Sequence, residues 1–173
     1  LQKNIYIEID TYGDAQLYQI EYAAIRKVFN DAPVHVSNGS SGYSVGFIAQ
    51  SENGSGVYNA TLYESEIIES QHDTSGQGSY HITIVSEITH GDMTRDGVVV
   101  VPEQGSAMVE MASTKGETGS RVLYALGRLM GLNQTVFHGI DADNYSSDRY
   151  QSVMNPNTSD TFYGFSNSQP YND

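Results

Sequence analysis

The residues best suited to catalysis or metal binding are few and widely spaced. The sequence has five histidines, at His35, His72, His81, His90 and His138. No two are four residues apart, the spacing at which one helix presents both to a shared zinc ion. His138, Asp141 and Asp143 form the tightest cluster of candidate ligands, which could hold a displaced metal. The alternative, which we favour, is a polar loop in which Asp141 pairs with Arg128 or Arg149.

Other patterns for chemistry are weaker. Residues 141–148 (DADNYSSD) are rich in oxygen atoms but lack the Asp-x-Asp-x-Asp-Gly spacing and distal Glu of a calcium loop. No Gly-x-Ser-x-Gly elbow indicates Ser-His-Asp catalysis. The chain has no cysteine, which excludes disulfides, a thiol nucleophile and thiolate metal sites. We therefore expect no cofactor.

An amphipathic helix is predicted over residues 121–134, and Gly131 stands where it would end. Its apolar stripe comprises Val122, Leu123, Leu126, Leu129 and Met130. The frame from Tyr124 to Gly131 resembles the active-site helix of metzincin-type zinc peptidases, His-Glu-x-x-His-x-x-Gly-x-x-His/Asp, which a methionine-centred turn follows. Residues 150–156 (YQSVMNP), with Met154, resemble that turn. Residues 137–141 (FHGID) and 162–166 (FYGFS) resemble the loop after the helix in haloarchaeal-type sequences and the closing segment after the turn.

The resemblance also implies that the chemistry is lost. On that frame Tyr124 and Arg128 replace the two zinc-binding histidines, Ala125 replaces the general base, and Gln134 replaces the third ligand. A catalytic zinc needs three donors and a carboxylate that takes a proton from its water. We expect Arg128 to be buried and paired with Asp141, and Met154 to pack beneath Tyr124 or Arg128.

The elements that would position these residues follow the hydrophobic pattern. Strands are predicted at residues 4–10, 44–49, 57–63, 80–88 and 96–102, the last buried on both faces, with an edge strand at 107–112. A helix capped by Asp14 should run to about Asn30, with Leu17, Ile20, Ala24, Ile25 and Val28 on its inner face. Residues 31–42 and 70–79 read as loops.

This order predicts an α/β (α+β) zincin-like fold. We expect a mixed, twisted sheet of about five strands, two main helices and an irregular C-terminal region with the methionine turn. A length of 173 residues favours one domain, 1–173, with the sheet and helices in 1–133 and a C-terminal subdomain in 134–173.

The charge balance is strongly acidic, with 21 Asp and Glu against 8 Lys and Arg. Such a surface repels nucleic acid and anionic membranes, and no apolar run is long enough to span a bilayer. A lysine-poor acidic surface also suits high salt, so we expect a halophilic source, and the resemblance to haloarchaeal-type sequences implies an archaeal one. The chain begins Leu-Gln-Lys without a methionine, from which we expect either that a signal or pro-segment was removed or that the numbering begins at a processed end.

Glycosylation sequons favour export. Asn-x-Ser/Thr occurs at Asn38, Asn53, Asn59, Asn133, Asn144 and Asn157. Thirteen tyrosines suit protein interfaces. We therefore expect an extracellular or virion-surface pseudoenzyme: a glycosylated structural subunit of a filament or cell coat that associates with itself or with other extracellular proteins. The alternatives are an active or displaced-site zinc metallopeptidase and a peptide-binding decoy.

Overall fold

The computed structural model describes residues 4–32, 43–62, 80–132, 152–154 and 161–165. The first strand, β1 (Asn4–Tyr12), lies inside the sheet. Ile7 and Ile9 are fully buried on one of its faces, and Glu8 and Asp10 are buried on the other. Successive side chains of a strand point to opposite faces, so both faces of this strand are covered.

Five strands form the main sheet in the order β2-β1-β4-β7-β6. The strands next to β1 are β2 (Ser44–Glu52) and β4 (Tyr80–Val85), and both run parallel to it. β7 (Ser106–Glu110) runs parallel to β4, whereas β6 (Val98–Val101) runs antiparallel to β7 at the edge. The expected α/β fold with a mixed sheet of about five strands is therefore confirmed.

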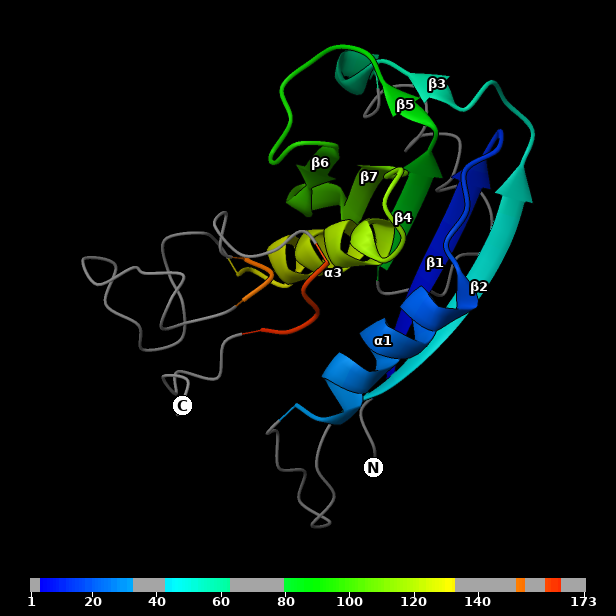
Figure 1. The fold of residues 1–173 in the computed structure, drawn as a ribbon. Coiled ribbons are helices and arrows are strands. Elements are labelled where there is room, and N and C mark those ends of the chain that lie inside the picture. The colour runs from blue at the N-terminus through cyan, green and yellow to red at the C-terminus, as the bar shows by residue number, and fades with distance from the viewer. Residues whose placement is uncertain (1–3, 33–42, 63–79, 133–151, 155–160, 166–173) are drawn as a thin grey trace.

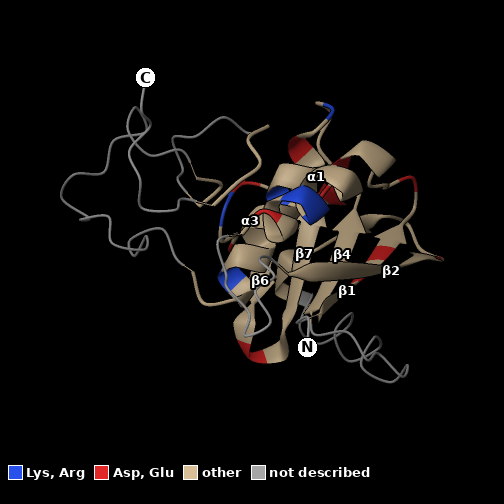
Figure 2. Cartoon of the chain, turned by 90° about the horizontal axis from the view of Figure 1, so that it is seen from below, with Lys and Arg blue, Asp and Glu red and all other residues tan. Residues whose placement is uncertain are grey.

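Two helices cover one face of this sheet (Figures 1 and 2). They are α1 (Gln19–Asn30) and α3 (Glu117–Leu129). The main core lies between the helices and that face of the sheet. Its fully buried members include Ile7, Ile9, Ile25, Ile82, Ile84, Ala107, Val109, Val122, Leu123, Tyr124 and Leu126.

The opposite face of the sheet carries a smaller apolar cluster and most of the buried polar side chains. Tyr12, Val85, Val99 and Met108 pack there against Ala60 and Ile88. These last two belong to a 3-10 turn (Ala60–Leu62) and to a two-stranded sheet of β3 (Val57–Tyr58) and β5 (Glu87–Ile88). The small sheet lies beyond the C-terminal end of β4 (Figure 1).

The first helix begins later than predicted. Tyr18, not Asp14, precedes its first turn, and the Glu21 carboxylate accepts a hydrogen bond of 2.9 Å from the Tyr18 N–H. The Glu21 side chain thus satisfies the N–H of Tyr18, the residue directly before the helix. Asp14 lies four residues before Tyr18 and does not cap this helix. Ile20 is 62% exposed, so its expected place on the inner face is wrong, while Tyr22 and Phe29 occupy that face.

Three strand predictions need correction. Residues 57–63 form a strand over Val57–Tyr58 alone before turning into the 3-10 segment. The predicted strand 80–88 divides at Ser86, whose N–H bonds to the Gly56 carbonyl, so that β5 leaves the main sheet. β6, expected to be buried on both faces, is buried at Val98 on one face and at Val99 on the other, and it half-buries Val100 and Val101 at the edge of the sheet; β7, expected at the edge, lies inside the sheet.

The last helix is present where the apolar stripe predicted it, but its limits differ. α3 begins at Glu117 instead of Arg121 and ends at Leu129. Gly131 follows with a φ of 90°, a left-handed conformation that favours glycine and ends the helix. Val122, Leu123 and Leu126 are buried as expected, and Leu129 and Met130 are half-buried. In the described part of the chain, neither helix has the length and apolarity required to cross a membrane.

Candidate functional site

Of the three α3 positions that the resemblance assigns to zinc chemistry, two are buried and one, Arg128, is less buried than expected. Tyr124 and Ala125 are fully buried, and Arg128 is half-buried. The Tyr124 hydroxyl donates a long hydrogen bond of 3.5 Å to the Thr94 carbonyl. The Arg95 guanidinium lies over the Tyr124 ring, 5.3 Å from its centroid. Where the resemblance would place a zinc ligand, the chain therefore has an aromatic ring beside a fixed positive charge.

The methionine of the turn-like segment packs against the same helix. Met154 is 1% exposed, which confirms its expected burial. A Cβ added to Gly127 would lie 2.5 Å from the Met154 sulfur and 2.8 Å from the Phe165 ring, so only glycine lets these side chains approach. Gly127 lies on α3 between Tyr124 and Arg128. Met154 and Phe165 thus pack against α3 at Gly127, and we call these two side chains the apolar floor of the helix.

Hydrogen bonds to backbone carbonyls position the segments that carry Met154 and Phe165. The Arg95 guanidinium donates a hydrogen bond of 2.9 Å to the Val153 carbonyl, and the Val153 N–H donates one of 2.7 Å to the Gly164 carbonyl. Ser120 of α3 donates through its hydroxyl to the Phe162 carbonyl at 2.9 Å. Residues 152–154 and 161–165 therefore contact α3 and each other.

The start of α3 is joined to α1 by a buried carboxylate. Glu21, 1% exposed, accepts a hydrogen bond of 3.0 Å from the Gly119 N–H in addition to that from Tyr18. Tyr163 donates to the Gly116 carbonyl at 2.6 Å. Burial, with a smaller contribution from Glu21, raises the pKa of the Tyr163 hydroxyl. These groups are satisfied by one another and by the helix terminus, which indicates a structural role.

Several predicted site residues lie outside the described residues: Gln134, His138, Asp141 and Asp143, together with the sequons Asn38, Asn133, Asn144 and Asn157. The expected pair between Arg128 and Asp141 is therefore not tested. Within the described chain, the Arg128 Nε atom has no hydrogen-bond acceptor. Of the remaining sequons, Asn53 is exposed, and the Asn59 side chain accepts a hydrogen bond of 3.0 Å from the Thr61 N–H.

A second candidate site lies on the opposite face of the sheet. Glu8 and Asp10 alternate along β1, and the register places His81 of β4 beside Glu8. Their exposed fractions are 4%, 3% and 7%. One ligand atom from each lies within 4.8 Å of the others, the spacing of a potential metal site. The His81 Nδ1 atom is 3.3 Å from Glu8 Oε2.

The surroundings of this cluster are short of positive charge. Gln50 of β2 donates a hydrogen bond of 2.9 Å to Glu8 Oε1 and fixes that carboxylate. Burial, then the charges of Glu8 and Glu52, raise the pKa of Asp10 to about 7. Among the described residues no Lys or Arg forms an ion pair with Glu8 or Asp10. The cluster thus combines metal-ligating groups with two carboxylates that no described Lys or Arg neutralises.

The sequence analysis did not predict this cluster, because residues 4–10 were interpreted as a strand of alternating apolar and polar residues and residues 80–88 as a β-branched strand. Both strands lie in the parallel part of the mixed sheet, and parallel strands are normally covered on both faces. Glu8, Asp10 and His81 therefore point into a second interior instead of toward solvent. The signal available in the sequence was acidic and histidine side chains within strands of strongly β-branched character.

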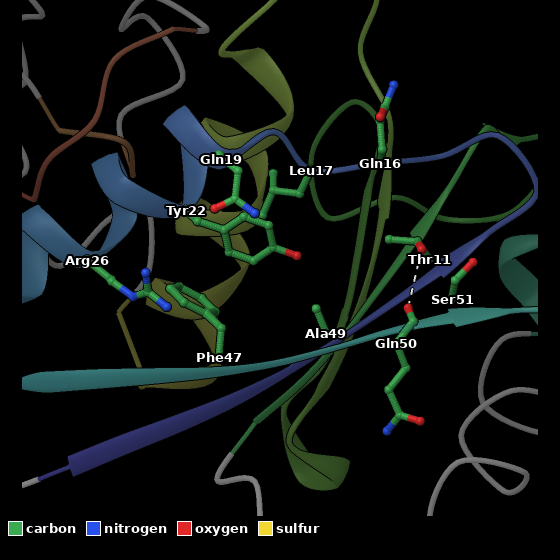
Figure 3. A pocket seen from close by; sticks show the side chains of 10 residues that line it. All are labelled: Thr11, Gln16, Leu17, Gln19, Tyr22, Arg26, Phe47, Ala49, Gln50 and Ser51. Atoms are coloured by element: carbon green, nitrogen blue, oxygen red, sulfur yellow. Dashed lines mark hydrogen bonds between the residues drawn. The ribbon is translucent and has the colours of Figure 1, made fainter.

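A shallow groove of about 430 Å³ lies between α1 and the edge strand β2 (Figure 3). Tyr22 and Phe47 meet edge to face with 5.0 Å between ring centroids, and the Arg26 guanidinium lies 5.0 Å from the Phe47 ring. Polar side chains of Thr11, Gln16 and Ser51 line the other end, while the Gln50 side chain points away. The groove contains no recognisable catalytic group.

The comparisons with known proteins add no family assignment. No protein-family model matches this sequence, and no curated protein matches it.

Proposed function

We propose that this chain is a zincin-like domain without peptidase chemistry, which serves as an extracellular, glycosylated structural or assembly subunit. The observation that carries the proposal is the setting of α3. A floor of Met154 and Phe165 lies against Gly127, yet the positions beside it hold Tyr124, Ala125 and Arg128. This packing supports the proposal, and the positions that the resemblance assigns to zinc ligands and to the general base hold no group suited to either task.

Electrostatics supports the loss of zinc at this helix. Arg95 stacks on the Tyr124 ring and is anchored by the Val153 carbonyl. Arg128 adds a second guanidinium at the frame position of the second histidine. Guanidinium groups stay protonated at all ordinary pH values, so they repel a divalent cation in this place.

The assembly role rests on the sequence. An acidic chain rich in tyrosine and in sequons fits an exported protein that binds other proteins, and Asn53 is exposed as a glycan acceptor must be. Self-association in a filament, virion surface or cell coat is the role that we propose, in a halophilic archaeal setting.

The test combines a cleavage assay with particle size. Purified protein is incubated with a mixture of peptides and added Zn²⁺, and the products are read by mass spectrometry, with the His138→Gln/Asp141→Asn variant in parallel. We expect no zinc-dependent cleavage, and we expect growth into large particles by light scattering at micromolar concentration. Cleavage that disappears in the double variant would establish a displaced-site peptidase instead. A stable monomer would overturn the assembly role and favour a peptide-binding decoy.

A further inference from the structure

Glu8, Asp10 and His81 are brought together by the sheet and not by any sequence motif. The two carboxylates are one strand repeat apart on β1, and His81 occupies the register position beside Glu8 on β4. Their ligand atoms lie within 4.8 Å of one another, and all three residues are buried. A strand pair is a stiff support, so these donors are held close without any loop having to order.

The Glu8 carboxylate has one satisfied and one unsatisfied oxygen. Oε1 accepts the hydrogen bond from Gln50, whereas Oε2 is buried and accepts no hydrogen bond within the described part of the chain. Oε2 faces the His81 Nδ1 atom at 3.3 Å. A buried carboxylate oxygen without a hydrogen bond is strongly unfavourable, and a cation between these donors would remove that penalty.

We propose that Glu8, Asp10 and His81 bind one divalent transition-metal ion, with Zn²⁺ as the probe. One imidazole and two carboxylates are a donor set that zinc accepts, and three protein ligands leave a further position open. Two carboxylates give the charge that a divalent cation neutralises. Gln50 acts as a positioning residue, because its amide holds Glu8 with Oε2 directed at the other donors.

This site is independent of the proposed loss of zinc at α3, since it lies on the other face of the sheet. Its role is structural: a bound ion would fasten β1 to β4. Zinc binding by the chain is therefore compatible with the absence of peptidase activity. The cleavage assay tests the proposed function, and the zinc titration tests the metal site, so each proposal can fail without the other.

The test is Zn²⁺ titration of the metal-stripped full chain by calorimetry, with thermal unfolding and elemental analysis. We expect one zinc per chain and a rise in Tm on binding. Glu8→Gln and Asp10→Asn preserve shape but remove a charged donor, and each should weaken binding by at least ~100-fold, beyond the ~10–100-fold typical of outer-sphere residues. Gln50→Leu should weaken binding by about 10-fold.

Matched controls are Glu87→Gln and His90→Gln, both at exposed positions, and the His138→Gln/Asp141→Asn variant; all should bind zinc as the wild type does. A readout free of folding defects is the imidazole NMR spectrum of the wild-type chain, in which zinc should shift the His81 resonances most. No zinc binding by the wild type, or unchanged binding by both carboxylate variants, would overturn the proposal.

Discussion

The two faces of the sheet differ in what they offer a metal ion. On the helical face, at or beside the positions of α3 that the sequence resemblance assigns to a zinc site, Tyr124, Arg95 and Arg128 supply a ring and two positive charges. On the opposite face, Glu8, Asp10 and His81 supply donors and negative charge without any sequence motif. The sequence resemblance and the donor chemistry therefore indicate different places in the molecule, and among the described residues only the second place has groups that can ligate a metal ion.

The two faces also treat buried carboxylates differently. Glu21, on the helical face, accepts hydrogen bonds from two backbone N–H groups at helix starts. Glu8, on the opposite face, has an oxygen without such a donor among the described residues. A satisfied carboxylate stabilises the fold, whereas an unsatisfied one needs a cation or a proton.

The largest expected effect is at the apolar floor of the helical face. Met154→Ala removes a fully buried side chain from beneath Gly127 and should lower the free energy of unfolding by about 2–5 kcal/mol. Urea unfolding measures this value, and Met93→Ala, at a position 37% exposed, is the control with less than ~1 kcal/mol expected. A similar small loss for both variants would mean that Met154 is not part of the structural floor.

Replacing the satisfied carboxylate should come next. Glu21→Gln removes the negative charge at the start of α3 and weakens two hydrogen bonds, which should lower the free energy of unfolding by about 2 kcal/mol. The exposed Glu87→Gln serves as the control in the same urea experiment. An unchanged Glu21→Gln protein would remove the contrast between the two buried carboxylates.

Replacing Asp10 in the metal-free protein is expected to raise the free energy of unfolding instead of lowering it. The pKa of Asp10 is raised from 3.8 to about 7, so the native state holds the proton more tightly than the unfolded chain. Stability from this group is present below pH 3.8 and is lost as the pH rises to about 7. Asp10→Asn should therefore stabilise the protein at pH 8 by on the order of 1 kcal/mol or more, and not at pH 4.

Thermal unfolding at the two pH values in the presence of a chelator measures this difference, with the exposed Asp14→Asn as control. Equal effects of Asp10→Asn at pH 4 and pH 8 would contradict the assignment to this face of carboxylates that no described Lys or Arg neutralises.

The smallest effect is expected at Tyr124. Its hydroxyl donates a bond of 3.5 Å, too long to contribute much, so Tyr124→Phe should lower the free energy of unfolding by less than about 1 kcal/mol. Tyr6→Phe, at an exposed position, is the control. If Tyr124→Phe lowered the free energy of unfolding by more than ~2 kcal/mol, the hydroxyl, and not the ring beneath Arg95, would be the stabilising group at this position.

The sequence predicted those parts of the fold that depend on periodicity. The Ile5, Ile7 and Ile9 alternation located β1, and the Val122, Leu123 and Leu126 stripe located α3. It failed where tertiary pairing decides: residues 107–112 were expected at the edge, but β7 lies between β4 and β6, because the apolar pattern of a strand carries no information about its neighbours. The cluster of Glu8, Asp10 and His81 depends on the register between β1 and β4, whose residues are about 70 apart in the chain, and no local pattern encodes that register.

The bond between Glu21 and Gly119 has a consequence for synthesis of the chain. Its two residues are separated by 98 positions. At ~5–20 residues per second, a ribosome needs about 5–20 s to make the segment between them. During that interval α1 has left the ribosome without the helix that completes its burial, and β1 also waits for β4. Nascent chains arrested before residue 119 should therefore be cleaved by added protease within β1 and α1, and chains released after α3 should resist it.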